Sequence, residues 1–271
     1  MVSPTNPYSP PGSAVADVKE PGLATAIAVP GRQVDAGRGV SWIGEGWTLF
    51  KAAPLLWIVL LVILVGVQLL LGLVPILGTI VNYLIYPVFM LGVLVFAKRI
   101  AEGGQAEIGD LFTGFREKLG PLVTVGALYL LMIGALLLIF LGILYPLVGA
   151  PPSADPEAFG LWMGTVIGEG GLAKVLLAVL VASALGIPVA AAYWFAPGLV
   201  YYADLGAWAA MKESFRTCLR NWLPFLVYGV MMLLVMIGGA FLLLIGMFLI
   251  SLPVLMASYY SSFSDLFGRK A

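Results

Sequence analysis

The sequence predicts an all-α membrane protein with six transmembrane helices, arranged as three hairpins that are each preceded by a cytoplasmic interfacial amphipathic helix. Three observations predict this class. Hydrophobic residues make up 61% of the 271 residues and charged residues only 10%, whereas soluble domains carry about 25% charged residues. Four long intervals contain no Asp, Glu, Lys or Arg. Short stretches that combine aromatic and basic residues stand before three of the hydrophobic blocks.

The charge-free intervals set the number of spans. A transmembrane helix needs about 20 apolar residues, so the first interval, which contains the turn sequence VPILG at 74–78, holds two spans. The last interval would rise roughly 66 Å as one helix, twice the hydrocarbon core, and we divide it near Gly246. The intervals are 52–97, 119–154, 175–203 and 221–264. The predicted spans are 53–73, 77–97, 121–147, 173–201, 222–242 and 246–263.

The basic residues predict the orientation of these spans. Of the 14 Lys and Arg residues, 13 fall on one face of the six-span arrangement and only Lys174 falls on the other. Cytoplasmic loops carry the excess of basic residues, so we expect a multi-pass protein of the bacterial inner membrane with both termini in the cytoplasm. Residues 1–39 are rich in Pro, Gly, Ala and Ser and show no signal peptide. They are predicted to be a disordered tail before a six-helix transmembrane domain over 40–271.

The stretches before the first, third and fifth spans have the pattern of amphipathic helices. Read as a helix, EIGDLFTGFREKLG at 107–120 places its apolar residues on one stripe, and Asp110 can cap its start. The three stripes are Ile108, Leu111, Phe112, Phe115 and Leu119; Ile43, Trp47 and Phe50; and Trp208, Met211, Phe215, Leu219 and Trp222. Such helices lie in a membrane interface. The predicted lipid contacts are Trp47, Phe50, Leu111, Phe112, Phe115, Arg116, Phe215 and Arg216.

These stretches resemble three copies of one unit, in which an interfacial helix is followed by a hairpin whose returning span carries a proline. The copies align at 46–47, 114–115 and 214–215, and the prolines are Pro87, Pro197 and Pro253. The closing DLFG at 265–268 has the form of a fourth interfacial helix cut short. Two explanations stay open, a true internal repeat or the aromatic and basic residues that most membrane interfaces carry.

Three segments resemble a family of bacterial, mostly proteobacterial, integral membrane proteins to which no activity is assigned. They are AGRGVSWIGEGWTLFKAAPLLWI at 36–58, YPVFMLGV at 86–93 and GDLFTGFREKLGPLV at 109–123, which match an AGRG–W–GWxLF opening and a DLFxGF loop. The layout is also distantly similar to the membrane domain of some glycerophosphodiester phosphodiesterases, without their catalytic barrel. The resemblance implies a membrane fold and no particular chemistry.

Residue types exclude several kinds of site. The chain has no histidine and one cysteine, Cys218, so it cannot hold an intrachain disulfide, an imidazole metal site or a multi-cysteine cluster. The predicted spans contain no Asp, Glu or His, the residues that mark proton relays. Asp155, Glu157 and Glu169 are expected in a solvated external loop. We therefore predict no catalytic, cofactor or metal site.

Three functions are considered for such a chain, and the third of them is disfavoured. The first is a non-enzymatic membrane component that organises lipid or protein, with membrane lipid, a second copy of the chain or another membrane protein as its partner and no role for nucleic acid. The alternative is a small transporter or channel for a neutral or apolar solute. A lipid-modifying enzyme is a third reading, which the missing histidine and the lack of acids in the spans disfavour.

Overall fold

The computed structural model describes residues 27–149, 155–168, 170–241 and 245–268, and within these residues every named element is a helix. The order is α1 (Arg38–Ala52), α2 (Pro54–Gly72), α3 (Pro75–Ala101), the 3-10 helix η2 (Ile108–Phe112), α4 (Thr113–Glu117), α5 (Leu119–Val148), α6 (Pro156–Ile167), α7 (Gly171–Trp194), α8 (Ala196–Tyr202), α9 (Ala207–Arg220), α10 (Trp222–Phe241), the π-helix η3 (Met247–Ser251) and α11 (Leu252–Phe267).

Within the described residues, six helical stretches are long and apolar enough to cross a membrane, so the predicted all-α class with six spans is confirmed. They are Pro54–Gly72, Pro75–Ala101, Leu119–Pro146, Gly171–Tyr202, Trp222–Phe241 and Met247–Phe267. The first turn forms where VPILG predicts it, because α2 ends at Gly72 and α3 begins with Pro75, whose fixed φ suits the first turn of a helix.

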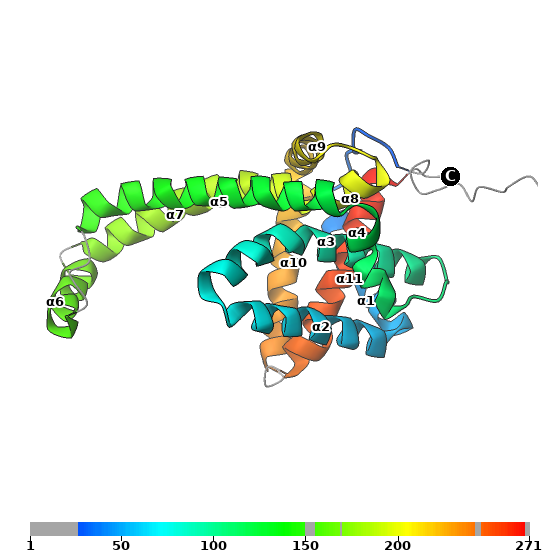
Figure 1. Cartoon of the computed structure of the whole chain (residues 1–271), viewed down its shortest axis with the longest axis horizontal. Coiled ribbons are helices and arrows are strands. Elements are labelled where there is room, and N and C mark those ends of the chain that lie inside the picture. Colours follow the sequence, from blue (N-terminus) through cyan, green and yellow to red (C-terminus); the bar gives the residue numbers. More distant parts are fainter. Residues whose placement is uncertain (1–26, 150–154, 169, 242–244, 269–271) are drawn as a thin grey trace, which may run out of the picture.

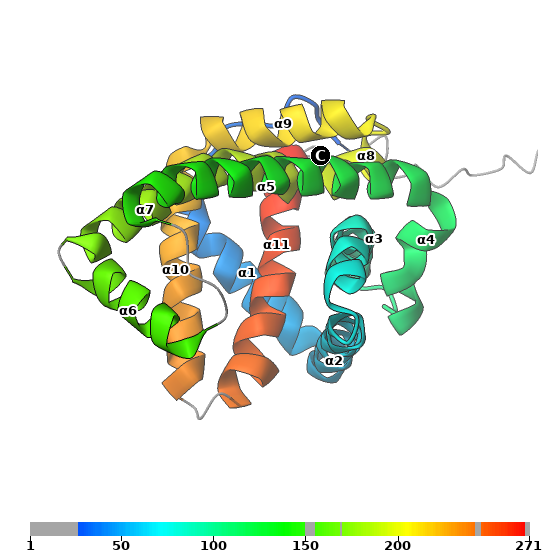
Figure 2. The same cartoon turned by 60° about the vertical axis from the view of Figure 1, so that its left-hand side comes forward.

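Consecutive spans lie side by side in pairs (Figures 1 and 2). In Figure 1 the pairs α2–α3 and α5–α7 extend toward the left, while α10 and α11 run downward across them. The helices α2 and α3 form one pair, and α10 packs against η3, which leads into α11. The long pair of α5 and α7 extends far beyond the others and carries α6 at its tip (Figure 1). Its side chains are widely exposed, as Leu131 and Leu138 show at 70% and 71%. Lipid would cover such surfaces in a bilayer.

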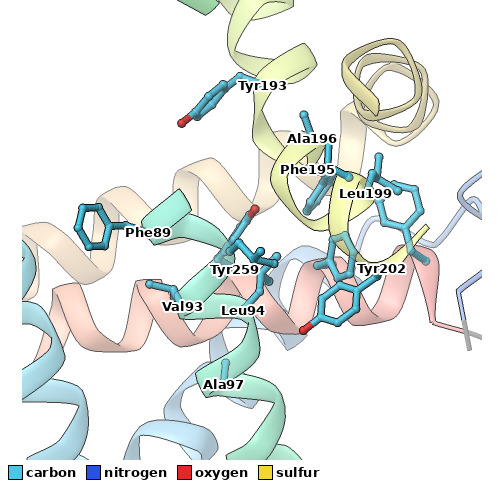
Figure 3. Packing of buried hydrophobic residues seen from close by; sticks show 14 of the residues in the cluster. Phe89, Val93, Leu94, Ala97, Tyr193, Phe195, Ala196, Leu199, Tyr202 and Tyr259 are labelled. Carbon is cyan, nitrogen blue, oxygen red and sulfur yellow. The ribbon is translucent and has the colours of Figure 1, made fainter. Parts of the chain in front are cut away.

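The core lies where the second helices of the three pairs meet. Figure 3 shows side chains of α3, of the α7–α8 junction and of α11 directed at one another, among them Leu94, Phe195 and Tyr259. All three are buried. Gly198 in α8 sits at this junction, because a Cβ there would lie 2.5 Å from the Phe263 ring and 2.8 Å from Leu94 Cδ1. The absence of a side chain at Gly198 lets the three helices approach.

Shorter elements surround this core in a cyclic order. The helix α1 packs against α10 and α11, η2 and α4 pack against α3, and α9 packs against α7 and α8. Each therefore contacts the returning helix of the preceding pair, and α1 closes the ring against the last pair. The aligned positions 46, 114 and 214 hold Gly, Gly and Ser, and all three are buried against those helices. Three repeats of one unit would produce this order.

The segment 107–120 is not the continuous helix that the sequence predicts. It forms η2 and α4, and the backbone breaks at Lys118 before α5 begins. Glu107 and Asp110 form a capping box at the start of η2. Leu111 then lies so close to α3 that a Cβ at Gly92 would be 2.2 Å from the Leu111 carbonyl oxygen. Docking on α3, rather than an amphipathic helix, sets the local backbone.

Two further expectations differ from the structure. The terminal DLFG does not begin a fourth interfacial helix, because Asp265–Phe267 form the last turn of α11, where Leu266 and Phe267 are buried. The predicted external loop contains α6, whose N-cap Asp155 accepts a hydrogen bond from Glu157 N at 3.2 Å. This helix follows from a proline at its first position after a capping aspartate. Glu169 lies outside the described residues.

Candidate functional site

The most polar site in the described part of the chain lies at the end of the bundle that carries α1, α4, α9 and the last turn of α11, which we name the basic end. A segment of 27–37, the N-terminal strap, runs across it. Ala28 N donates to Phe267 O at 2.7 Å and Arg32 N donates to Leu266 O at 2.9 Å. The disordered tail predicted over 1–39 is therefore wrong for residues 27–39, since the strap is bonded and α1 begins at Arg38.

Buried polar side chains of α9 and its C-cap hold the strap. Gly31 N donates to Glu213 Oε1 at 3.0 Å. Asn221, which is fully buried, accepts from Val34 N at 2.9 Å and donates to Arg32 O at 3.0 Å. Buried backbone groups need such partners, so the polar face of α9 turns inward to supply them.

Asp265 is the centre of the site. Its side chain is 9% exposed and both its oxygens are engaged. Oδ1 accepts from Arg32 Nη2, while Oδ2 accepts from Arg38 Nε and from Trp42 Nε1, the latter at 2.9 Å. Arg38 also donates through Nη2 to Glu45 Oε1 at 2.7 Å. The carboxylate thus joins the strap, α1 and α11 at one point.

An open cavity of about 490 Å³ lies beside this carboxylate. Its polar lining comes from Arg32, Arg38, Glu45, Thr48, Ser261 and Ser264. Among the described residues, no group of three or more His, Cys, Asp or Glu side chains could hold a metal ion. The arrangement offers two cations, two carboxylates and hydroxyl groups, which suit binding of a charged polar group.

The first predicted interfacial element packs against protein rather than lipid over much of its length. In α1, Trp42 is fully buried and Phe50 is 7% exposed, while Trp47 is 42% exposed. Phe50 is therefore wrong as a predicted lipid contact, because α1 inserts between α10 and α11. Trp47 stacks near Phe50 at 5.6 Å between ring centroids and keeps an outer face.

The second predicted element, which forms η2 and α4, also packs largely against protein. Leu111 is fully buried against α3, so it is also wrong as a lipid contact. Phe112 is exposed, and Phe115 is half-buried with its ring 5.2 Å from that of Phe89 on α3. Arg116 is exposed and donates to Gly109 O at 2.6 Å. This element is mainly a packing unit.

The third element, α9, keeps an outward amphipathic face. Its inward residues are small or polar, and include Glu213, Ser214, Thr217 and Cys218. Its outward face carries an apolar edge of Trp208, half-buried Phe215 and Leu219 and a basic edge of Lys212, Arg216 and Arg220. Met211 of the predicted stripe is buried. The eight predicted lipid contacts are thus not brought together. On α9 an apolar edge lies beside an edge of three basic residues.

Ser214 explains why α9 docks where the fourth span breaks. Its hydroxyl accepts from Phe195 N at 2.9 Å and donates to Ala191 O at 2.6 Å. These two backbone groups are an i and i+4 pair, which would bond each other in an unbroken helix. The Ser214 hydroxyl therefore bridges the gap between α7 and α8.

Sequence reasoning missed the Asp265 site, although two signals for it were present. Arg38 and Trp42 belong to the AGRG–W opening of the first quoted segment. Asp265 belongs to the second occurrence of DLF, and Asp110 of the first is also buried and paired with Arg99 at 3.2 Å. A buried aspartate facing arginine is what the two DLF sequences share.

Comparison with known proteins gives one similarity. The chain is 30% identical to a probable inner membrane protein of Burkholderia thailandensis over 213 residues, which cover 77% of each protein. No family model matches the chain, and no solved structure matches it. The similarity extends over most of both chains.

Proposed function

Because this chain belongs to the family of that bacterial inner membrane protein, we propose that it is a non-enzymatic component of the inner membrane that organises lipid. The observation that carries the proposal is the outward face of α9. Burying a Trp or Leu side chain contributes about 1.5–3 kcal/mol, and each Lys or Arg beside an anionic surface contributes about 1 kcal/mol. Glu213 is turned inward, so no acidic residue of α9 opposes this attraction.

The proposal places the basic end in the cytoplasm, where anionic lipid gives the leaflet a negative surface potential. The excess of Lys and Arg at this end supports that orientation. With α9 flat on the leaflet, Trp208 and Leu219 would enter the headgroup region while Lys212, Arg216 and Arg220 meet lipid phosphates. Membrane lipid is then the partner, and the exposed spans leave room for a second copy of the chain or another membrane protein.

Cysteine labelling tests the orientation. Burial raises the pKa of the Cys218 thiol to about 12, and maleimides react with the thiolate, so the natural cysteine should stay unlabelled until the protein is denatured. Lys212→Cys, on the exposed face of α9, should label with a membrane-impermeant maleimide only after spheroplasts are permeabilised. Labelling of this variant in intact spheroplasts would reverse the proposed orientation.

Removing the basic edge tests the function. The triple variant Lys212→Gln, Arg216→Gln, Arg220→Gln should lose most of the preference of the reconstituted protein for spin-labelled phosphatidylglycerol over phosphatidylcholine. Three charges at about 1 kcal/mol each, weakened by salt, predict a loss of roughly tenfold or more at low ionic strength. Lys174→Gln, at the other end of the bundle, is the control and should change nothing.

An unchanged lipid preference in the triple variant would remove the basis of the proposal. Flux of a neutral solute through reconstituted protein would instead favour a transporter or channel. Turnover of lipid by the purified protein would show an enzyme.

A further inference from the structure

The cavity beside Asp265 contains a cationic region with unused hydrogen-bonding capacity. Arg32 contacts Asp265 through Nη2 only, and a guanidinium offers five N–H donors. Arg38 uses Nε and Nη2. The two arginine side chains are 31% and 34% exposed. The Asp265 side chain also lines the cavity, but it is only 9% exposed and both its oxygens accept hydrogen bonds. The cavity wall therefore presents guanidinium donors, whose geometry suits phosphate.

An acidic group stands beside this cationic region. Glu45 is 43% exposed, and its Oε1 pairs with Arg38 at 2.7 Å. Its other oxygen has no partner in the described residues. A ligand cation bound by Glu45 would thus lie next to an anion bound by the arginines. The hydroxyl groups of Thr48, Ser261 and Ser264 line the same cavity.

We infer that this cavity binds a phosphoethanolamine headgroup, with its phosphate on Arg32 and Arg38 and its ammonium group on Glu45. The two arginines and the two carboxylates balance, so the site matches a zwitterion rather than a net anion. Phosphatidylglycerol has no cation for Glu45, and the quaternary ammonium of phosphatidylcholine cannot donate a hydrogen bond. The cavity of about 490 Å³ lies within the usual range of about 300–1,000 Å³ for ligand sites.

The ligand is a membrane lipid rather than a soluble phosphoethanolamine, because the cavity opens beside the cytoplasm-proposed ends of two spans, α3 and α11. Ala101 at the end of α3 and Tyr260 of α11 line it. This inference deepens the proposed lipid function but uses a different surface from α9. An experiment can therefore contradict the proposal for α9 and leave the inference about the cavity standing, or the reverse.

Native mass spectrometry of the purified full chain tests the inference. Phosphatidylethanolamine, phosphatidylglycerol and phosphatidylcholine with the same acyl chains are titrated in turn. The natural protein should bind the first at least tenfold more tightly than the others, as loss of one charge-assisted hydrogen bond predicts. Glu45→Gln should abolish this preference with little change in the melting temperature, because Glu45 and Arg38 are both partly exposed and such ion pairs contribute little to stability. Arg32→Lys keeps the charge and should weaken phosphatidylethanolamine binding less than Arg32→Gln.

Three results would overturn the inference. The first is equal binding of the three lipids by the natural protein. The second is a full preference for phosphatidylethanolamine in Glu45→Gln. The third is competition by free phosphoethanolamine or inorganic phosphate at the concentration of the lipid, which would assign the site to a soluble ligand. The triple variant of α9 should alter binding of phosphatidylglycerol and leave the phosphatidylethanolamine preference intact, which separates the two proposals.

Discussion

Asp265→Asn is expected to destabilise the protein by about 3 kcal/mol. Asparagine has nearly the same shape and can still accept from Trp42, but it carries no charge to balance Arg32 and Arg38. Removing one partner of a buried ion pair costs about 3–5 kcal/mol, and the partial exposure of both arginines places the effect at the lower end. The melting temperature of the detergent-solubilised protein measures the change.

The same substitution should release the N-terminal strap. Trypsin should then cleave after Arg32 and Arg38 faster than in the natural protein. Asp204→Asn is the control, because Asp204 also pairs with a basic side chain, Lys118, but is 79% exposed, and surface pairs contribute little. If the Asp265 and Asp204 variants melt at the same temperature and are cut at the same rate, Asp265 does not anchor the strap.

Gly46→Ala is expected to separate α1 from α11. A Cβ at Gly46 would lie 2.7 Å from both Val254 O and Ser258 N. These are backbone atoms, so no side-chain rotation can relieve the contact, and overpacking costs about 1–3 kcal/mol. We expect a clear fall in melting temperature, with faster cleavage of the strap because α1 carries Arg38 and Trp42 toward Asp265.

Gly44→Ala is the matched control in the same helix. A Cβ at Gly44 meets nothing within 4 Å, and replacing glycine by alanine in a helix contributes about 0.5–1 kcal/mol of stability. The two substitutions should therefore act in opposite directions. A stable Gly46 variant would mean that α1 does not pack on α11 as described.

The spans could be predicted because their signal is local. Length and the absence of charge decide whether a segment crosses a bilayer, and neither depends on a distant partner. The turn between the first two spans could also be predicted from local sequence, since VPILG at 74–78 contains a proline and a glycine that favour a turn. The division near Gly246 agrees with the last two candidate spans, which are Trp222–Phe241 and Met247–Phe267.

The interfacial elements were harder to predict. A stripe of apolar residues indicates that one face of a helix is kept from water, but it does not indicate whether lipid or protein covers that face. Phe50 and Leu111 satisfy the same periodicity as Trp208, yet protein buries the first two, whereas Trp208 is 59% exposed. Glycines on the packing surfaces could have distinguished contact with protein from contact with lipid. Gly46 and Gly92 allow backbone contact between helices, which lipid would not require.

The polar site could not be predicted because its partners are far apart along the chain. Gly31 and Glu213 are separated by 182 residues, and Val34 and Asn221 by 187. The composition of 27–37 alone suggests disorder, since the segment has few apolar residues to bury. Its order comes from acceptors on α9 that no local pattern connects with it.

The closure of the ring by α1 against α11 has a consequence for biosynthesis. Trp42 and Asp265 are separated by 223 residues, and a ribosome adds about 5–20 residues per second. Roughly 11–45 s therefore pass between the emergence of α1 and that of its docking partner. During that interval the face of α1 that contains Gly39 and Gly46, which later packs on α10 and α11, must be covered by lipid or by the insertion machinery. The last pair of spans, once inserted, displaces that cover and completes the bundle.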